Sequence, residues 1–292
     1  EFQRKQMTTT KSKNVFPLAV ESDFDGCQNI VKQMFLDKEL HNDNVRFIAA
    51  NSINWARCMT QSVYFFWTYL KLPELKRNIT FSIPSGNFGH AYAGWTAKEM
   101  GLPIEKLLIA TNTNDVLHQT FSTNNYAKTN VVQTLAPSMD ISVASNFERL
   151  LYNLYDDDSS LLAKNMLSFP ERSIDIPEDK QELVSGFFKS YKSNDQEILE
   201  QIHDTYSKTR YILDPHTATG VRASDIISID DPVITMGTAH PAKFTDAIEK
   251  AIPEYNAFIP AKVEIAFKQD EQFSILEDNY DEIKKFILTN AL

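Results

Sequence analysis

Several classes of protein are excluded by what the 292-residue sequence lacks. Its two cysteines, Cys27 and Cys58, are too few for a disulfide framework and predict a reduced, cytoplasmic setting. No apolar run approaches the roughly 18 residues of a membrane-spanning helix. With 29 basic against 39 acidic residues, the formal charge of −10 argues against nucleic-acid binding. Zinc-ligand spacing, a Walker phosphate loop and a GxSxG nucleophile elbow are also missing, so we expect no metal site.

The remaining composition is that of a globular protein, with 42% hydrophobic and 23% charged residues. Short apolar segments alternate with longer segments of helical periodicity, which predicts an α/β fold with an open, mostly parallel sheet flanked by helices. The expected strands are residues 14–20, 79–83, 107–110 and 233–236, and the expected helices are residues 23–36, 51–70, 87–100, 215–227 and 241–252. Residues 112–134 are expected on the surface and residues 145–209 to be mainly helical.

The first candidate site follows the strand at 79–83, in the segment SIPSGNFG (82–89). Gly86 and Gly89 allow backbone N–H groups to converge, and the start of a helix adds partial positive charge, so the turn suits a phosphate. A tight turn that needs glycine only for its geometry is the alternative. Small residues recur every four positions at Gly89, Ala93 and Ala97, which predicts a helix packed closely on the sheet.

The second candidate site is NSINWAR (51–57) at the start of the next expected helix. Asn51, Ser52 and Arg57 would present an amide, a hydroxyl and a guanidinium in one direction. Arginine binds oxyanions by two parallel hydrogen bonds, so this is a second possible anion site. An N-cap followed by a solvated arginine is the alternative.

A third segment, GTAHPAKF (237–244), follows the strand at 233–236, and ligands of open α/β sheets bind at such strand ends. Thr238 offers a hydroxyl there. His240 could act as an acid or base, although a histidine before proline more often serves to begin a helix. His216, in DPHTATG, has the same two interpretations.

Nine segments in one order resemble threonine synthase, a pyridoxal-phosphate enzyme of fold type II (the tryptophan synthase β group), in its bacterial and fungal version. The segments are QMTT (6–9), DFDGCQNIVK (23–32), NSINWAR (51–57), PSGNFG (84–89), AKEMGLPIEKLLIATNTND (97–115), LAPSMDI (135–141), SNFERLL (145–151), YILDPHTATGV (211–221) and GTAHPAKF (237–244).

The resemblance assigns the first and third segments to the cofactor, pyridoxal 5′-phosphate. It implies that Thr238 contacts the ring nitrogen, and a neutral hydroxyl there is expected to leave that nitrogen largely unprotonated. The residues implied to bind the cofactor phosphate are Ser85, Gly86, Asn87, Phe88 and Gly89.

The resemblance assigns NSINWAR to the substrate. Asn51, Ser52 and Arg57 are implied to bind the phosphate of O-phospho-L-homoserine, which the reaction converts with water to L-threonine and phosphate, the last step of threonine biosynthesis. His90 stands where this family usually has Asp. It is expected at the substrate site, either as an anion ligand when protonated or as a mark of altered substrate choice.

One departure from the family concerns the lysine that forms the Schiff base with the cofactor. That lysine lies in an upstream F-K-D type segment that this sequence does not contain, so we expect no catalytic residue in this chain and no activity of the chain alone. The expected partner is the N-terminal half of the same enzyme. Residues 1–50 would be the remnant of a small domain and residues 51–292 the large cofactor-binding domain. A phospholyase related to threonine synthase and a non-catalytic phosphate-binding domain are the alternatives.

Overall fold

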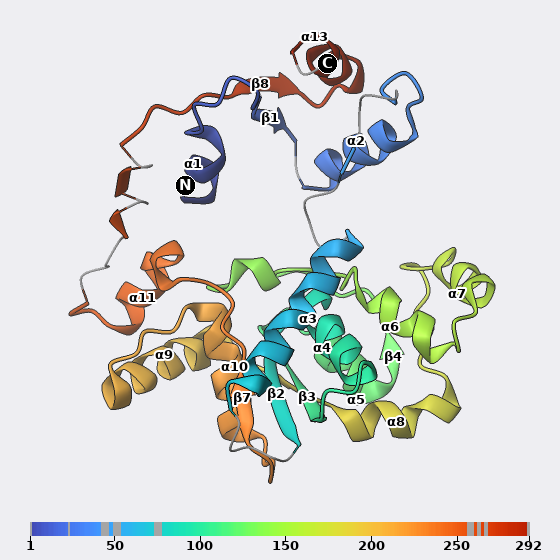
Figure 1. Cartoon of the computed structure of the whole chain (residues 1–292), viewed down its shortest axis with the longest axis vertical. Helices are drawn as coiled ribbons and strands as arrows, with labels where there is room; N and C mark the ends of the chain where they lie inside the picture. Colours follow the sequence, from blue (N-terminus) through green and yellow to red (C-terminus); the bar gives the residue numbers. More distant parts are fainter. Residues whose placement is uncertain are drawn as a thin grey trace. The chain divides into compact units, whose positions relative to one another are not determined.

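The chain forms two compact units, Ala50–Ala257 and a smaller unit made of Glu1–Ala49 with Phe258–Leu292 (Figure 1). Residues 258–292 group with the N-terminal segment in the smaller unit. The physical reason is a parallel pair between β1 (Leu18–Glu21) and β8 (Ser274–Glu277). The computed structural model describes residues 2–22, 24–41, 47–48, 54–72, 78–255, 260–261, 264–265 and 268–290.

The larger unit is built on a four-stranded sheet in the order β6–β3–β2–β7, with every pair parallel. This confirms the α/β fold with a mostly parallel sheet. Ser82 of β2 lies opposite Leu108 of β3 and Thr235 of β7, so the carboxyl ends of these strands share one edge. The strands are β2 (Ile79–Pro84), β3 (Ile104–Thr111), β6 (Phe188–Lys192) and β7 (Val233–Thr235).

The two faces of the sheet are covered by different helices, as the alternation along β3 shows. Leu107 and Ile109 belong to the main core, on the side of α4 (Gly89–Glu99), whereas Leu108 and Ala110 pack with Ala223 of α10 (Pro215–Ile226). Both faces are therefore buried, as parallel sheets require.

Small residues bring α4 close to its neighbours. Ala93 and Ala97 are buried, and a Cβ added to Gly94 would lie 3.0 Å from Phe65 of α3 (Trp55–Leu70) and 3.2 Å from Leu107. Helix α4 thus packs between the sheet and α3, directly after the turn that joins it to β2 (Figure 1).

The remaining elements of the larger unit follow the sequence expectations in part. The segment expected on the surface contains a helix, α5, and a short strand, β4, while the segment expected to be helical also contains β5 and β6. The elements are α5 (Val116–Thr123), β4 (Asn125–Tyr126), η1 (Pro137–Met139), α6 (Phe147–Leu154), α7 (Ser159–Met166), β5 (Ile174–Asp175), η2 (Glu178–Lys180), α8 (Gln181–Phe187), α9 (Asp195–Thr209), η3 (Pro241–Lys243) and α11 (Thr245–Ala251).

The smaller unit has its own core, in which Ile30 and Met34 of α2 pack with Leu40 and Ile283. Its other helices are α1 and α13, and β1 starts four residues later than expected at Leu18. In the described part of the chain, no helix is both long and apolar enough to cross a membrane. The helices are α1 (Phe2–Thr8), α2 (Phe24–Leu36) and α13 (Tyr280–Asn290).

Candidate functional site

The phosphate loop, defined here as residues 84–89, joins the end of β2 to the start of α4. Ser85 continues the strand by donating its backbone N–H to the Ala110 carbonyl over 2.8 Å. The residue is 5% exposed, and its Oγ has no hydrogen-bond partner among the described residues. An unpaired buried hydroxyl costs stability, so its position beside a helix N-terminus points to a ligand.

Phe88 gives the loop its shape. Its φ of 68° is in the left-handed region, which is uncommon for a large side chain, and α4 begins directly after it. Asn87 Oδ1 accepts the Gly89 N–H over 3.3 Å. The ring is fully buried among aromatic rings, with centroids 5.2 Å from Phe147, 6.0 Å from Phe121 and 6.1 Å from Phe188. The first N–H groups of a helix lack intrahelical partners and favour an anion.

Gly86 faces the segment LAPSMD (135–140), which lies directly behind the loop. A Cβ at this position would be 3.0 Å from the Ser138 carbonyl oxygen and 3.2 Å from Met139 Cα, so only glycine fits without a shift. Asp140 holds the segment by accepting hydrogen bonds from Asn112 Nδ2 and Asn114 Nδ2, at 2.7 and 2.8 Å. These asparagines come from the loop after β3.

Thr238 lies at the end of β7, beside the phosphate loop. Met236 donates its N–H to the Ser82 carbonyl, which continues the strand pairing beyond the Ser82–Thr235 pair. Ser85 and Thr238 each lie three residues beyond that pair. The first and third predicted segments are therefore brought together at one edge of the sheet.

The hydroxyl of Thr238 belongs to a hydrogen-bond network around Asp214, the N-cap of α10. Thr217 Oγ1 donates to Asp214 Oδ2, accepts the N–H of Thr238 over 3.1 Å and lies 3.2 Å from Thr238 Oγ1. His216 Nδ1 lies 3.0 Å from Asp214 Oδ1, and its Nε2 accepts the Ser138 N–H over 3.1 Å. His216 is thus a structural link between Asp214 and the segment behind Gly86.

His90 and Thr238 line one cavity of about 520 Å³ together with residues of α3 and β7. His90 Nδ1 lies 2.9 Å from Gln61 Oε1, and the ring is 5.0 Å from that of Phe65. Burial lowers the pKa of His90 from 6.5 to about 4, so the imidazole is neutral at neutral pH. Gln61 Oε1 can only accept, so the neutral ring carries its proton on Nδ1 and its Nε2 is an acceptor, which differs from the protonated anion ligand considered from the sequence.

The second predicted segment is described only from residue 54 onward, and Asn51 and Ser52 lie outside the described residues. Helix α3 begins at Trp55, and its N-cap is Asn54, whose side chain accepts the Ala56 N–H. Arg57 is exposed in the first turn.

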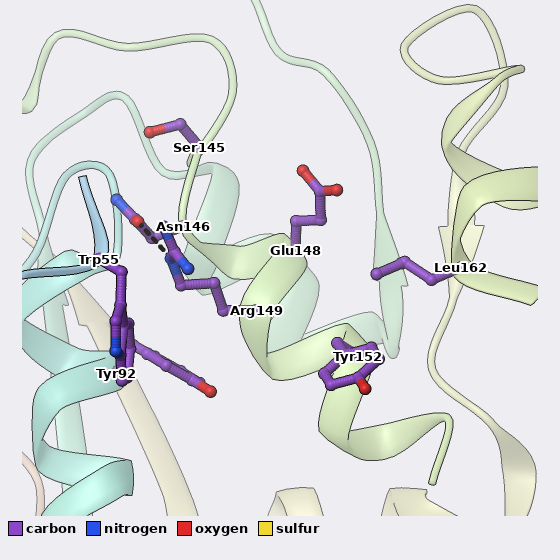
Figure 2. A pocket seen from close by; sticks show the side chains of 8 residues that line it. All are labelled: Trp55, Tyr92, Ser145, Asn146, Glu148, Arg149, Tyr152 and Leu162. Carbon is purple, nitrogen blue, oxygen red and sulfur yellow. Dashed lines mark hydrogen bonds between the residues drawn. The ribbon is translucent and has the colours of Figure 1, made fainter. Parts of the chain in front are cut away.

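A second arginine, Arg149 of α6, lines a cavity of about 450 Å³, which we name the arginine cavity (Figure 2). Its Nε donates to Asn146 Oδ1 over 3.0 Å, and its guanidinium lies 5.4 Å from the Trp55 ring centre. Asn146 is 1% exposed, and within the described part of the chain its Nδ2 has no hydrogen-bond partner. Figure 2 shows Arg149 reaching from α6 toward Asn146 and Trp55. The lining residues are Trp55, Tyr92, Ser145, Asn146, Glu148, Arg149, Tyr152 and Leu162.

The arginine cavity lies close to Arg57 and to the phosphate loop. Burial raises the pKa of Cys58, while the charges of Arg149 and Arg57 act to lower it, so both arginines lie near this thiol. Asn146 also donates its backbone N–H to the Asn87 carbonyl over 3.0 Å. Arg149 lies in the segment SNFERLL (145–151), and nothing local in that segment indicates that its side chain lines a cavity.

The third predicted segment contributes Thr238 but no catalytic histidine. His240 is exposed, and its Nδ1 accepts the Ala242 N–H as the cap of η3, which agrees with the structural interpretation. Among the described residues, no cluster of His, Cys, Asp and Glu has the arrangement of a metal site.

Comparisons with known proteins agree with this architecture. The family model described as "Threonine synthase, C-terminal" matches residues 217–287. A threonine synthase of Pseudomonas aeruginosa is 39% identical over 98% of this chain and 62% of its own length. A threonine synthase of Saccharomyces cerevisiae is 40% identical over 88% of this chain and 54% of its own length. The chain thus spans less than two thirds of these relatives.

Among solved structures, the threonine synthase of Brucella melitensis, bound to pyridoxal phosphate, superposes with a TM-score of 0.90 at 38% identity. The superposition covers 99% of this chain and 62% of the Brucella melitensis chain. The yeast threonine synthase superposes with a TM-score of 0.87 at 34% identity, over 99% of this chain and 62% of its own. The fold is accordingly that of the fold type II pyridoxal-phosphate enzymes. Within that class, the chain is similar to the threonine synthases.

Proposed function

We propose that this chain serves the reaction of a threonine synthase, the conversion of O-phospho-L-homoserine and water to L-threonine and phosphate. Pyridoxal 5′-phosphate is the cofactor, and the reaction is the last step of threonine biosynthesis. Similarity to threonine synthases over 98% of the chain supports this function. A cytoplasmic location is part of the same proposal.

The observation that carries the proposal is the phosphate loop. The buried Ser85 Oγ lacks a partner, the N-terminus of α4 faces the loop, and a Cβ at Gly86 would meet backbone atoms at 3.0 Å. These features fit a phosphate group bound at the loop, and they require that position 86 have no side chain. Residues 85–89 would hold the cofactor phosphate, and Thr238, at the matching position after β7, would contact the ring nitrogen.

The substrate phosphate would be held by Asn51, Ser52 and Arg57, and we add Arg149 to this group. Arg149 lines the arginine cavity. Its guanidinium, bonded to Asn146 and near the Trp55 ring, is suited to bind an oxyanion. His90 contributes a neutral ring at the side of the cofactor site, beside Thr238.

Each group has a part in the reaction. When bound, the cofactor delocalises the negative charge that develops on the substrate carbon next to the amino group. The loop amides and Ser85 fix the cofactor by its phosphate, so that its ring position is set before the substrate enters. The arginines stabilise the charge that develops on the leaving phosphate. Lys98 donates to the carbonyl of Ile104, the first residue of β3, at the end of the strand opposite the phosphate loop, and so has no part in the proposed site.

The test uses pyridoxine 5′-phosphate, which has the cofactor's ring and phosphate but no aldehyde and so needs no lysine. We expect saturable binding by the 292-residue chain, measured by calorimetry, and competition by inorganic phosphate. If the chain binds unphosphorylated pyridoxine as tightly as pyridoxine 5′-phosphate, the assignment of the loop is refuted.

The reaction is tested by product analysis with O-phosphohomoserine in a protein that contains this chain together with a lysine-bearing N-terminal half. Threonine supports the synthase, whereas a keto acid without threonine would identify a phospholyase. The chain alone is expected to form neither product.

A further inference from the structure

Asn146 is the N-cap of α6, a helix of eight residues, but its side chain makes no capping hydrogen bond. An N-cap asparagine ordinarily accepts a backbone N–H of the first helical turn through Oδ1. Here Oδ1 accepts the Arg149 Nε–H over 3.0 Å and the Cys58 thiol over 3.4 Å. The side chain is therefore directed toward Arg149 and Cys58 instead of its own helix, whose N-terminus favours an anion.

The same two bonds fix the orientation of the Asn146 amide. Both partners are donors, so the atom that they meet is the carbonyl oxygen Oδ1, and the other atom is the amide nitrogen Nδ2. This nitrogen is buried and has no acceptor among the residues that the structure describes. A buried NH2 group without an acceptor costs stability, and Asn146 lines the arginine cavity, so we expect a ligand there to supply the acceptor.

Two donor side chains and a helix N-terminus therefore lie at one side of the arginine cavity. Figure 2 shows the side chains of Arg149 and Asn146 meeting there, whereas the exposed Glu148 extends in another direction. The guanidinium of Arg149 and the NH2 group of Asn146 can only donate hydrogen bonds. A ligand group held between them must present several oxygens that accept, as a phosphate does.

We propose that Asn146 binds the phosphate of the substrate and that, together with Arg149, it selects the dianionic form of that phosphate. This inference rests on the proposed function, which places the substrate phosphate at Arg149. A phosphate monoanion carries a P–OH hydrogen, which would face donors on both residues and find no acceptor. The second pKa of a phosphate monoester is about 6, so the dianion predominates at pH 7.5 and the monoanion at pH 5.

The backbone of Asn146 has a separate role, because its N–H donates to the Asn87 carbonyl of the phosphate loop over 3.0 Å. A substitution of the side chain leaves this bond in place. Changes at Asn146 should therefore alter the affinity for the substrate and not the affinity for pyridoxine 5′-phosphate, which separates a binding role from a general disturbance of the site.

The experiment measures binding of O-phospho-L-homoserine to the 292-residue chain by calorimetry at pH 7.5 and pH 5. The wild type should bind about tenfold more weakly at pH 5, because only about a tenth of the ligand is dianionic there. Asn146→Asp keeps Oδ1 and the shape of the side chain but replaces the donor with an acceptor. At pH 7.5 this variant should bind about tenfold more weakly than the wild type, and the preference for pH 7.5 should be lost.

Two variants serve as controls. Asn130→Asp adds the same charge at an exposed asparagine that lines neither of the two cavities, and it should leave the affinity at both pH values unchanged. Glu148→Gln removes the carboxylate that lines the arginine cavity, and it should keep the preference for pH 7.5. Burial raises the pKa of both Cys58 and Tyr92, so these two groups stay protonated over this range. The other ionisable side chains that the structure describes beside the cavity are Arg57, Arg149 and Tyr152.

Equal affinity of the wild type at the two pH values overturns the inference, as does an unchanged pH preference in Asn146→Asp. In both cases the proposed substrate site stands if Arg149→Ala binds more weakly than the wild type. If Arg149→Ala binds normally, that site is wrong and the inference fails with it. If Asn146→Asp does not fold, Asn146→Ala takes its place. That variant should bind the substrate more weakly and pyridoxine 5′-phosphate normally, and normal binding of both ligands overturns the inference.

Discussion

The phosphate loop and the arginine cavity are both suited to anions, but they are built from different parts of the chain. The loop consists of backbone, shaped by Gly86 and by the buried ring of Phe88. The cavity depends on long side chains, above all Arg149 resting near Trp55. A side-chain site must order its rotamers on binding, at about 0.5–1.5 kcal/mol for each. A substitution that moves the loop backbone should therefore weaken binding more than the loss of one side chain from either site.

The largest effect is expected at Gly86. Gly86→Val places a branched side chain where even a Cβ would be 3.0 Å from the Ser138 carbonyl oxygen, so pyridoxine 5′-phosphate affinity should fall by about a hundredfold or more. Gly186→Ala is the matched control, because a Cβ there meets nothing within 4 Å. Undiminished affinity of the Gly86 variant, measured by calorimetry, would sink the assignment of the loop.

A smaller effect is expected at Ser85, with opposite signs for binding and stability. Ser85→Ala removes a buried hydroxyl that has no partner in the protein, so the free energy of unfolding without ligand should stay the same or rise by about 1 kcal/mol. Affinity for pyridoxine 5′-phosphate should fall roughly tenfold. Urea unfolding and calorimetry measure the two quantities. A stability loss with normal affinity would make Ser85 a structural residue only.

The arginines should separate the two sites. Arg149→Ala is expected to weaken binding of O-phosphohomoserine roughly tenfold, and Arg57→Ala by less, because Arg57 is exposed and does not line the cavity. Neither change should alter the affinity for pyridoxine 5′-phosphate. Arg149→Lys keeps the charge without the planar fork and serves as the matched variant. Loss of cofactor affinity in Arg149→Ala would mean that the two sites are interchanged.

His90 should affect the stability of the fold and leave the affinity for pyridoxine 5′-phosphate unchanged. Its folded pKa of about 4 is below the unfolded value of 6.5, so the unfolded chain binds the proton first as the pH falls. The contribution to stability is complete above pH 6.5 and is lost between pH 6.5 and 4, amounting to at most about 3 kcal/mol.

Urea unfolding at pH 7.5 and pH 5 measures this loss. His90→Asn should reduce the difference between the two pH values, and His240→Asn, which changes an exposed histidine, should not. If the difference in unfolding free energy between pH 7.5 and pH 5 is the same in His90→Asn as in the wild type, the lowered pKa of His90 is not its cause.

The sequence could predict features formed by consecutive segments, but not those formed by segments far apart in the chain. The phosphate loop is local, because β2, the loop and α4 are consecutive and each has its own pattern. The Asp214 network is not local, since Thr238 meets groups 21 and 24 residues earlier. From the sequence, Asp214 could be predicted only as a helix cap, which it also is.

Two features of the fold, strand β6 and the place of residues 258–292 in the smaller unit, were not predictable for a similar reason. Strand β6 (FKSYK) follows α8 without a turn and is an edge strand with polar residues, so its pattern did not stand out from the helices around it. Residues 258–292 could not be assigned to the smaller unit, because the β1–β8 pair joins segments about 250 residues apart. Nothing near either segment indicates its partner.

The left-handed conformation of Phe88 has a thermodynamic consequence. A strained φ persists only where surrounding contacts fix it, and here the buried ring, packed among three other aromatic rings, supplies them. The loop amides are thus preorganised in the ligand-free protein, and an arriving phosphate displaces water without having to order the chain. Affinity at this loop therefore depends in part on hydrophobic packing, and a polar substitution at Phe88 should weaken anion binding.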